Sequence, residues 1–368
     1  MAKRLRVLCA AAAVLPLALL AACSSGSSGN SPSSSASAPG AAANGKTITE
    51  TGSTLLFPLF GAWQTDYNTA FPDVTITSGA TGSGTGITDA ATGLVNIGAS
   101  DAYLSRADLQ TYPGLLNIPL AVSAALVMYN VPGVKGHLKF NAKVLSEIYS
   151  GKITTWNDPA IKALNPGVSL PAMKVVPVHR SDSSGTTFIF TSYLNAQDPK
   201  DWPIANVGTT VTWPSVPGQL GELGSGGMVA GCQATKGCIA YVGTSYLSKL
   251  QDAGLGEGEL GNKAGNFELP TTASIKAALA QFEPKTPASG AQSLINTTTA
   301  DGYPIINYEY AIVKKQQPSA AEAAAVQKFL TWIVTKGNSS TYLDPVLFQP
   351  LPPRVLAISQ KLISSISG

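Results

Sequence analysis

Short apolar runs alternate with amphipathic stretches along residues 46–368, and turns rich in Gly, Ser and Thr separate them. The runs with strand character lie at 47–50, 74–77, 95–101, 175–178 and 239–243. The stretches with helical character lie at 55–63, 87–92, 187–194, 224–232, 273–282 and 320–335. Strands that alternate with helices predict an α/β fold, in which ligand-binding groups gather at the carboxyl ends of the strands.

A longer apolar stretch at 117–130 predicts an extended strand that crosses between two lobes. Two further runs, 303–306 and 308–313, predict strands that return to the first lobe. The region between about 131 and 170 has more polar residues and is interpreted as mainly helical. The segments 120–125 and 302–306 are therefore the candidate hinges between the lobes.

The first 22 residues have the pattern of a targeting segment, with three basic residues followed by an apolar run at 7–20. Leu20-Ala21-Ala22-Cys23 resembles the lipobox of bacterial lipoproteins, in which the Cys becomes the lipidated first residue. A plain secretory signal is the alternative. The apolar run is too short for a stable transmembrane span, so the lipid would be the anchor. Residues 23–45 are nearly all Ser, Ala, Gly, Asn and Pro, which predicts a flexible tether.

The charge balance argues against nucleic acid as a partner. The chain has 24 Lys and Arg against 21 Asp and Glu, and residues 1–22 contain three of the basic residues and no acidic one. Without that segment the balance is 21 against 21, so any selectivity for anions must be local. No Lys-Ser/Thr pair follows the glycine-rich run 82–86, so it is not a nucleotide-binding P-loop, and we expect no cofactor.

Two cysteines, Cys232 and Cys238, lie within the globular part of the chain. Outside the cytoplasm such a closely spaced pair predicts a small disulfide loop. A zinc site is the weaker alternative, because the chain has only His137 and His179 and neither neighbours the pair. We therefore expect no metal.

The turn at 180–186 has the chemistry of an anion site. It joins the strand at 175–178 to the helix at 187–194, and a helix start exposes unpaired N–H groups with a partial positive charge. Ser184, Gly185 and Thr186 would add donors there, and the guanidinium of Arg180 suits a tetrahedral oxyanion. The alternative is that Asp182 or Ser184 only caps the helix.

Two further helix starts follow strands in the same way. Thr54 lies in the turn 51–54 before one helix, and Ser83 lies in the glycine-rich run before the next. Asp101 stands at the end of the strand at 95–101. Three helix starts, at Thr54, Ser83 and Ser184, could converge on one anion without an exposed field of charge.

Five motifs in this order resemble the phosphate-binding lipoproteins of bacterial phosphate ABC transporters, over residues 46–365. They are Thr51-Gly52-Ser53-Thr54, Gly82-Ser83-Gly84-Thr85-Gly86, Gly98-Ala99-Ser100-Asp101, Gly151-Lys152-Ile153-Thr154-Thr155-Trp156-Asn157-Asp158 and Arg180-Ser181-Asp182-Ser183-Ser184-Gly185-Thr186. The resemblance implies a two-lobed, type II periplasmic-binding-protein-like α/β fold with the ligand in the cleft between the lobes. We expect lobe I at 46–122 plus 303–368 and lobe II at 123–302.

The resemblance also implies how the chain acts. It would bind inorganic phosphate with high affinity outside the cytoplasm, held at the cell membrane by a lipid anchor with palmitate, and deliver the ion to the transmembrane subunits of an ABC permease. Asp182 would hold Arg180 in place, and Leu55, where the family often has Phe, would act through its backbone N–H. The residues implied to bind phosphate are Thr54, Leu55, Ser83, Asp101, Arg180, Ser184, Gly185 and Thr186.

Asp101 is the unusual member of this set, because a carboxylate beside an anion is repulsive. It is explained if the ligand carries a proton to donate, as hydrogen phosphate and dihydrogen phosphate do near neutral pH and sulfate does not. A buried carboxylate without that donor would penalise the wrong ligand. The alternative is that Asp101 only caps a turn at the end of its strand.

Three rival functions remain from the sequence. An exported phosphatase or serine hydrolase would use Ser83 or Ser184 as nucleophile, but neither serine lies in a Gly-x-Ser-x-Gly elbow and histidines are scarce, so we expect no enzyme. A binding protein for another oxyanion, such as sulfate or molybdate, would not need the proton acceptor Asp101. In a structural or adhesive surface protein, the anion turns would be plain helix caps.

Overall fold

The computed structural model describes residues 46–368. The expected targeting segment 1–22, the lipid-bearing Cys23 and the tether 23–45 lie outside the described residues. Within residues 46–368, no helix combines the length and the apolar character needed to cross a membrane.

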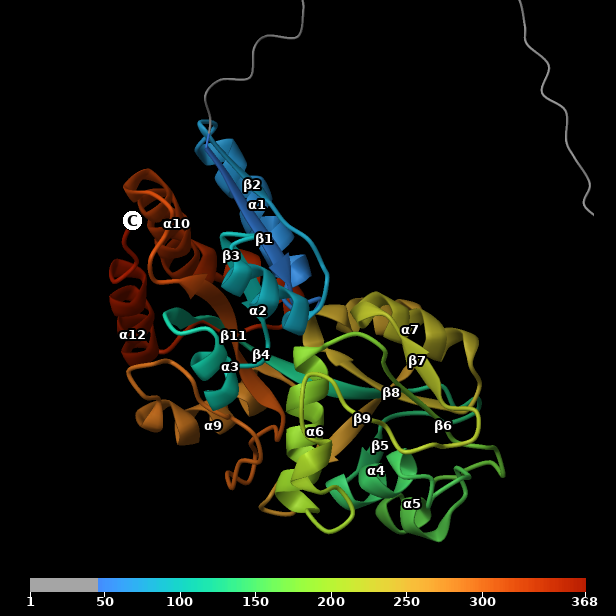
Figure 1. Cartoon of the computed structure of the whole chain (residues 1–368). Helices are drawn as coiled ribbons and strands as arrows, with labels where there is room; N and C mark the ends of the chain where they lie inside the picture. Colours follow the sequence, from blue (N-terminus) through green and yellow to red (C-terminus); the bar gives the residue numbers. More distant parts are fainter. Residues whose placement is uncertain (1–45) are drawn as a thin grey trace, which may run out of the picture. The chain divides into compact units, whose positions relative to one another are not determined.

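The predicted alternation of strands and helices is present throughout the described residues (Figure 1). The strands are β1 Lys46–Gly52, β2 Val74–Thr77, β3 Ile97–Ser100, β4 Leu115–Tyr129, β5 Leu138–Phe140, β6 Val176–Arg180, β7 Leu220–Glu222, β8 Cys238–Gly243, β9 Gly256–Gly261, β10 Phe267–Glu268 and β11 Ile306–Lys314. The helices are α1 Phe57–Ala70, α2 Ser83–Thr92, α3 Arg106–Thr111, α4 Ala142–Tyr149, α5 Pro159–Leu164, α6 Gly185–Gln197, α7 Gly224–Ala234, α8 Leu247–Asp252, α9 Thr272–Phe282, α10 Ala320–Thr335, α11 Ser340–Leu343 and α12 Pro353–Ser364.

The strand β4 links two groups of strands. The strand order is β2-β1-β3-β11-β4-β8-β6-β7, with β9 also paired to β4. Residues Leu115–Ala124 of β4 pair with β11, whereas Ala125–Tyr129 pair with β8, so the partner changes between Ala124 and Ala125. We refer to the elements around β1, β3 and β11 as the first lobe and those around β8 and β6 as the second lobe (Figure 1). The lobe boundaries given above, 46–122 plus 303–368 and 123–302, stay a prediction.

The hydrophobic core of the first lobe contains an aromatic cluster between α1 and α10. Phe60 and Tyr67 of α1 each meet Phe329 of α10 edge to face, with ring centroids 5.7 and 4.7 Å apart. The indole N–H of Trp63 donates to the carbonyl of Gly337 at 2.8 Å, so its polar atom is satisfied although the side chain is fully buried. This packing fixes α1, and with it the turn that carries Thr54.

Three predictions about local structure are wrong. The run 83–86 is the first turn of α2 and no loop, so that helix begins four residues before the expected Ile87. Glycine is required because a Cβ on Gly86 would lie 2.7 Å from the carbonyl oxygens of Ala99 and Thr51. Of the segment 303–306, Ile305 forms only an isolated bridge and Ile306 is the first residue of β11. The region interpreted as mainly helical also contains the strand β5.

The disulfide predicted between Cys232 and Cys238 is present and joins the C-terminal part of α7 to the start of β8. The two residues are six apart in sequence, and a loop of this length stabilises the fold by about 2 kcal/mol through the entropy of the unfolded chain.

We expect replacement of both cysteines by Ala to lower the free energy of unfolding by about 2 kcal/mol. Urea titration followed by circular dichroism measures this change. The wild-type protein under strong reductant is the matched control and should lose a similar amount. Equal stability of the oxidised wild type and the double variant would contradict this contribution.

Candidate functional site

Arg180 ends β6 and is almost fully buried, and its predicted partner Asp182 is half-buried. Its Nε donates to Oδ1 of Asp182 at 2.6 Å, and its Nη2 donates to Oδ2 of the same carboxylate. Burial by itself would raise the pKa of Asp182, but the hydrogen bond and charge of Arg180 outweigh it and lower that pKa below the usual aspartate range. The two-point contact fixes the plane of the guanidinium and leaves its Nη1 for another acceptor.

Ser184 caps α6, as one of the two alternatives for this turn predicted. Its hydroxyl accepts from the backbone N–H of Thr187 at 3.1 Å, and the helix begins at Gly185. A capping role for the side chain does not remove the helix dipole, and the cap leaves the first N–H groups of the helix without an intrahelical acceptor. The start of α6 therefore presents amide donors beside Arg180.

Asp101 follows β3 and receives hydroxyl donors from both lobes. Ser53 donates to its Oδ1, and Thr186 of α6 donates to its Oδ2 at 2.8 Å. Its backbone N–H donates to the hydroxyl of Ser83 at 3.2 Å. Burial raises the pKa of the Asp101 carboxyl, although the two hydroxyl bonds and the charge of Arg180 oppose that shift.

Gly185 is one of the positions where the two lobes approach each other closely. A Cβ built on Gly185 would lie 2.6 Å from Oγ of Ser83, 2.7 Å from Cβ of Asp101 and 2.9 Å from the backbone N of Ala102. A side chain at this position would therefore push the start of α6 away from two parts of the first lobe. These are the start of α2 and the residues that directly follow β3. The structure has the two lobes in contact here.

Thr54 and Leu55 meet the second lobe through different groups. The hydroxyl of Thr54 lies 2.8 Å from that of Ser225 and accepts from the Ser225 backbone N–H at 3.1 Å. The carbonyl of Leu55 accepts from the hydroxyl of Ser245 at 2.6 Å. Thr54 precedes α1 by three residues, so the expectation that it lies at the helix start itself is corrected: α1 begins at Phe57.

A network of contacts connects most of the predicted site. The Asp182 carboxylate accepts from the backbone N–H of Gly224 at 3.2 Å, next to the Ser225 that bonds Thr54. The charge of Arg180 opposes the rise that burial causes in the pKa of Asp101, whose carboxylate also accepts a hydrogen bond from the hydroxyl of Thr186. The structure thus brings Thr54, Ser83, Asp101, Arg180, Gly185 and Thr186 to facing elements of the two lobes, whereas Cys232 and Cys238 lie towards the other end of α7 from Ser225.

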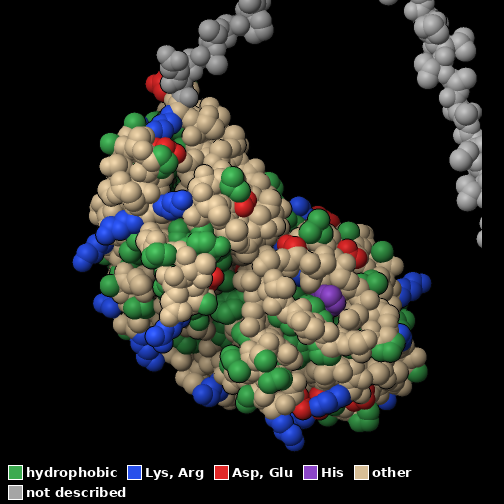
Figure 2. All heavy atoms as spheres, viewed as in Figure 1, with side chains coloured by type: hydrophobic (Ala, Val, Ile, Leu, Met, Phe, Trp, Pro, Cys, Tyr) green, Lys and Arg blue, Asp and Glu red, His purple; other side chains and the backbone are tan. Residues whose placement is uncertain are grey.

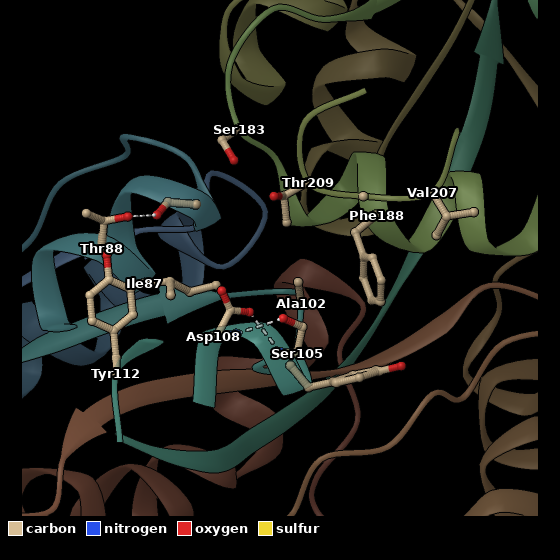
Figure 3. Close-up of a pocket in the computed structure, with 13 residues that line it drawn as sticks. Ile87, Thr88, Ala102, Ser105, Asp108, Tyr112, Ser183, Phe188, Val207 and Thr209 are labelled. Carbon is tan, nitrogen blue, oxygen red and sulfur yellow. Dashed lines mark hydrogen bonds between the residues drawn. The ribbon is translucent and has the colours of Figure 1, made fainter. Parts of the chain in front are cut away.

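A cavity of about 430 Å³ borders this group (Figure 3). Its walls come from α2 and α3 of the first lobe and from Ser183, Phe188 and the segment 207–209 of the second. The rings of Tyr103 and Phe188, which both line the cavity, are in edge-to-face contact with centroids 5.4 Å apart. Ala102 and Ser183, which follow Asp101 and Asp182 in sequence, line the same cavity, so it lies at the edge of the predicted site.

Comparison with known proteins gives the family. A family model described as a PBP superfamily domain matches residues 37–336. The phosphate-binding protein PstS of Xylella fastidiosa is 32% identical over 310 residues, which cover 84% of this chain and 82% of that protein. PstS of Methanocaldococcus jannaschii is 33% identical over 339 residues, which cover 87% and 86%. The chain belongs to the PstS family of phosphate-binding proteins.

A solved structure agrees with this assignment at the level of fold. The phosphate-binding protein from Stenotrophomonas maltophilia superimposes with a TM-score of 0.67 at 21% identity, covering 86% of this chain and 93% of that one. The predicted two-lobed α/β fold of periplasmic binding proteins is thereby confirmed. The resemblance that the five sequence motifs indicated is confirmed as well.

Several polar residues of this PstS family member were not predicted to support the site. Ser53 and Ser225 could have been found, because Ser53 lies within the motif 51–54 and Ser225 follows the glycine that opens α7. Tyr241 gave no signal within its apolar strand, yet its hydroxyl accepts from the backbone N–H of Arg180 at 3.1 Å. Glu309 did have a sequence signal, because it is the single acidic residue within β11.

On the face that Figure 2 shows, Lys and Arg side chains of residues 46–368 do not gather into a positively charged patch. Lys and Arg side chains are scattered towards the periphery there, with Asp and Glu between them. The buried guanidinium of Arg180 and the helix starts are thus the local sources of positive potential near Asp101. This agrees with the nearly balanced composition of the chain.

Proposed function

We propose that this chain binds inorganic phosphate, as hydrogen phosphate or dihydrogen phosphate, with high affinity outside the cytoplasm. It then delivers the ion to the transmembrane subunits of an ABC importer. The observation that carries the proposal is the buried Asp101 carboxylate, which lies among hydroxyl donors and helix starts from both lobes. Membership of a family of phosphate-binding proteins supports the same ligand.

Each predicted site residue has a role in this proposal. The N–H groups at the start of α6 and the hydroxyls of Thr54, Ser83, Ser184 and Thr186 donate to phosphate oxygens, and Arg180 adds charge-assisted bonds. Leu55 and Gly185 contribute backbone N–H groups, and Asp182 holds Arg180. Asp101 accepts the ligand's proton. To reach the ligand, Thr186 and Ser53 need only rotate hydroxyls that now bond Asp101.

Capture is coupled to a movement of the lobes in this proposal. Phosphate makes contacts with both lobes only when they are closed, so it shifts the population towards the closed form. The segments 120–125 and 302–306 act as the hinge, where β4 changes its partner strand and the Ala125 N–H donates to the Ile305 carbonyl at 3.1 Å. The closed form docks on the permease, and a lipid on Cys23 keeps the protein at the membrane.

Asp101 tests the ligand most sharply. We expect Asp101→Asn to improve sulfate binding at pH 7 by at least about 100-fold, because the substituted amide can donate where the carboxylate could only accept. Phosphate binding should weaken by no more than about tenfold, because the amide oxygen can still accept the ligand's proton. Calorimetric titration with each anion measures both changes. Equal changes for phosphate and sulfate would contradict the role of Asp101 as proton acceptor.

A further inference from the structure

Glu309 is a second fully buried carboxyl group next to Asp101, on the side of the first lobe. Tyr310 of β11 pairs with Ser100 of β3 in antiparallel register, so the preceding Glu309 comes beside the following Asp101. The pairing of β11 with β4 shifts by one residue between Glu309 and Tyr310, where Leu120 of β4 has no partner in the register. Glu309 has no exposed surface.

The two oxygens of Glu309 have different surroundings. Oε1 accepts from the hydroxyl of Ser123 at 2.5 Å and from the amide of Asn307 at 3.4 Å. Oε2 is buried and has no hydrogen-bond donor among the described residues. A buried carboxylate oxygen without a donor is costly, whereas a protonated one needs only an acceptor. Asp101 is the neighbouring acceptor.

The electrostatics favours the same arrangement. Burial, and then the charge of Asp101, raise the pKa of Glu309 well above the usual glutamate range. Two adjacent carboxyls in a dry site cannot both ionise at neutral pH. Asp101 is the one that ionises, because it has two hydroxyl donors and lies in the field of Arg180. Among the titratable groups, Arg180 of β6 opposes the rise that burial causes in the pKa of Asp101, and Glu309 adds to the rise that burial causes in the pKa of its neighbour Tyr310 on β11.

We propose that Glu309 is a positioning residue of the phosphate site that holds one proton and donates it in a hydrogen bond to Asp101. Its donor keeps Asp101 ionised and aimed at the ligand, so Glu309 sets the pH below which the site stops rejecting sulfate. This inference rests on the proposed function and deepens it. No net transfer of the proton occurs: it stays on Glu309, while the ligand's own proton is shared with Asp101.

The sign of the pH effect follows from this arrangement. As pH falls through the raised pKa of Asp101, that carboxyl becomes neutral and can donate to sulfate, so sulfate binding appears. Loss of the Glu309 donor raises the Asp101 pKa further. We expect Glu309→Met to move the midpoint of sulfate rejection up by about one pH unit. In Glu309→Gln the amide still donates to Asp101, so the midpoint should lie within about half a pH unit of the wild-type midpoint.

Glu50 provides a matched control. It is also a buried strand glutamate of the first lobe with an unpaired Oε2 and a strongly raised pKa, but Asp101 is not among the causes of its shift. Glu50→Met and Glu50→Gln should therefore leave the sulfate midpoint in place. Any variant should be compared only after circular dichroism has shown that it is folded.

The experiment is calorimetric titration of the wild-type protein and these four variants with phosphate and with sulfate, from pH 4.5 to 8. A midpoint shifted in Glu309→Met and restored in Glu309→Gln supports the inference. Equal shifts in both Glu309 variants, or the same shift in Glu50→Met, would overturn the positioning role of Glu309. The proposed phosphate-binding function would not be affected by that result. Absence of phosphate binding by the wild type would overturn the proposed function, and this inference with it.

Infrared spectroscopy tests the inference without Glu309→Met, and so applies even if that variant does not fold. Wild type at pH 7 should show the carbonyl band of a buried protonated carboxylic acid, and Glu309→Gln should lose one such band on subtraction. An unchanged acid band in Glu309→Gln would show that Glu309 is ionised and would overturn the inference.

Discussion

Arg180→Met is expected to reduce phosphate affinity on the order of 1000-fold. Arg180 supplies the only guanidinium among the predicted site residues, and its side chain is almost fully buried against Asp182. Methionine keeps much of the volume but removes the charge and every donor, so the Asp182 carboxylate keeps only backbone N–H donors, among them that of Gly224. Calorimetric titration with phosphate at pH 7 measures the loss.

Arg354→Met is the matched control for charge and composition. Arg354 lies on α12, where its guanidinium donates to the carbonyl of Thr286 at 3.3 Å. Its replacement should leave phosphate affinity unchanged within the error of the titration. Binding by Arg180→Met at the wild-type level, in folded protein, would mean that the anion is held elsewhere.

Gly185→Ala is expected to weaken phosphate binding by about 10- to 100-fold through sterics alone. The added methyl group would lie within 2.9 Å of Ser83, Asp101 and Ala102, all of the first lobe. Overpacking of this kind costs about 1 to 3 kcal/mol, and that cost falls on the closed form. Alanine is otherwise the better residue in a helix, so the stability of the unliganded protein should not fall.

Small-angle X-ray scattering and a control variant separate closure from folding in this variant. Small-angle X-ray scattering should show that phosphate compacts the wild type more than Gly185→Ala at the same concentration. Gly226→Ala is the control, because Gly226 also lies in the first turn of a helix and its added methyl would meet nothing within 4 Å. Wild-type affinity and compaction in Gly185→Ala would contradict a closed form built on this contact.

The sequence predicted best the elements whose signal is local. The Ala-rich helix α10 was expected at 320–335 and spans those residues, with Ser319 accepting from the N–H of Glu322 as its cap. The strand β2 also matches its predicted range, 74–77. In both, the apolar period and the flanking residues agree, so local preference and tertiary packing lead to the same structure.

Local signals failed where tertiary contact overrides propensity. Glycines 84 and 86 argue against a helix, yet α2 includes both, because Gly86 packs closely on the backbone of β1 and β3 and Gly84 packs closely on Ser183. The polar surroundings of Asp101 could be predicted only in part. Ser53 and Thr186 were within reach of the motifs, but the approach of Glu309 depends on the register between β3 and β11, which a single sequence does not reveal.

The most direct test of the proposed function is a calorimetric titration of the ligand-stripped, folded protein with phosphate, followed by sulfate, at pH 7. We predict one-to-one binding of phosphate with high affinity and no measurable heat with sulfate, because Asp101 lacks a proton donor in the sulfate complex. Sulfate binding as tight as phosphate binding would contradict the discrimination by Asp101. Absence of phosphate binding would contradict the proposed function itself.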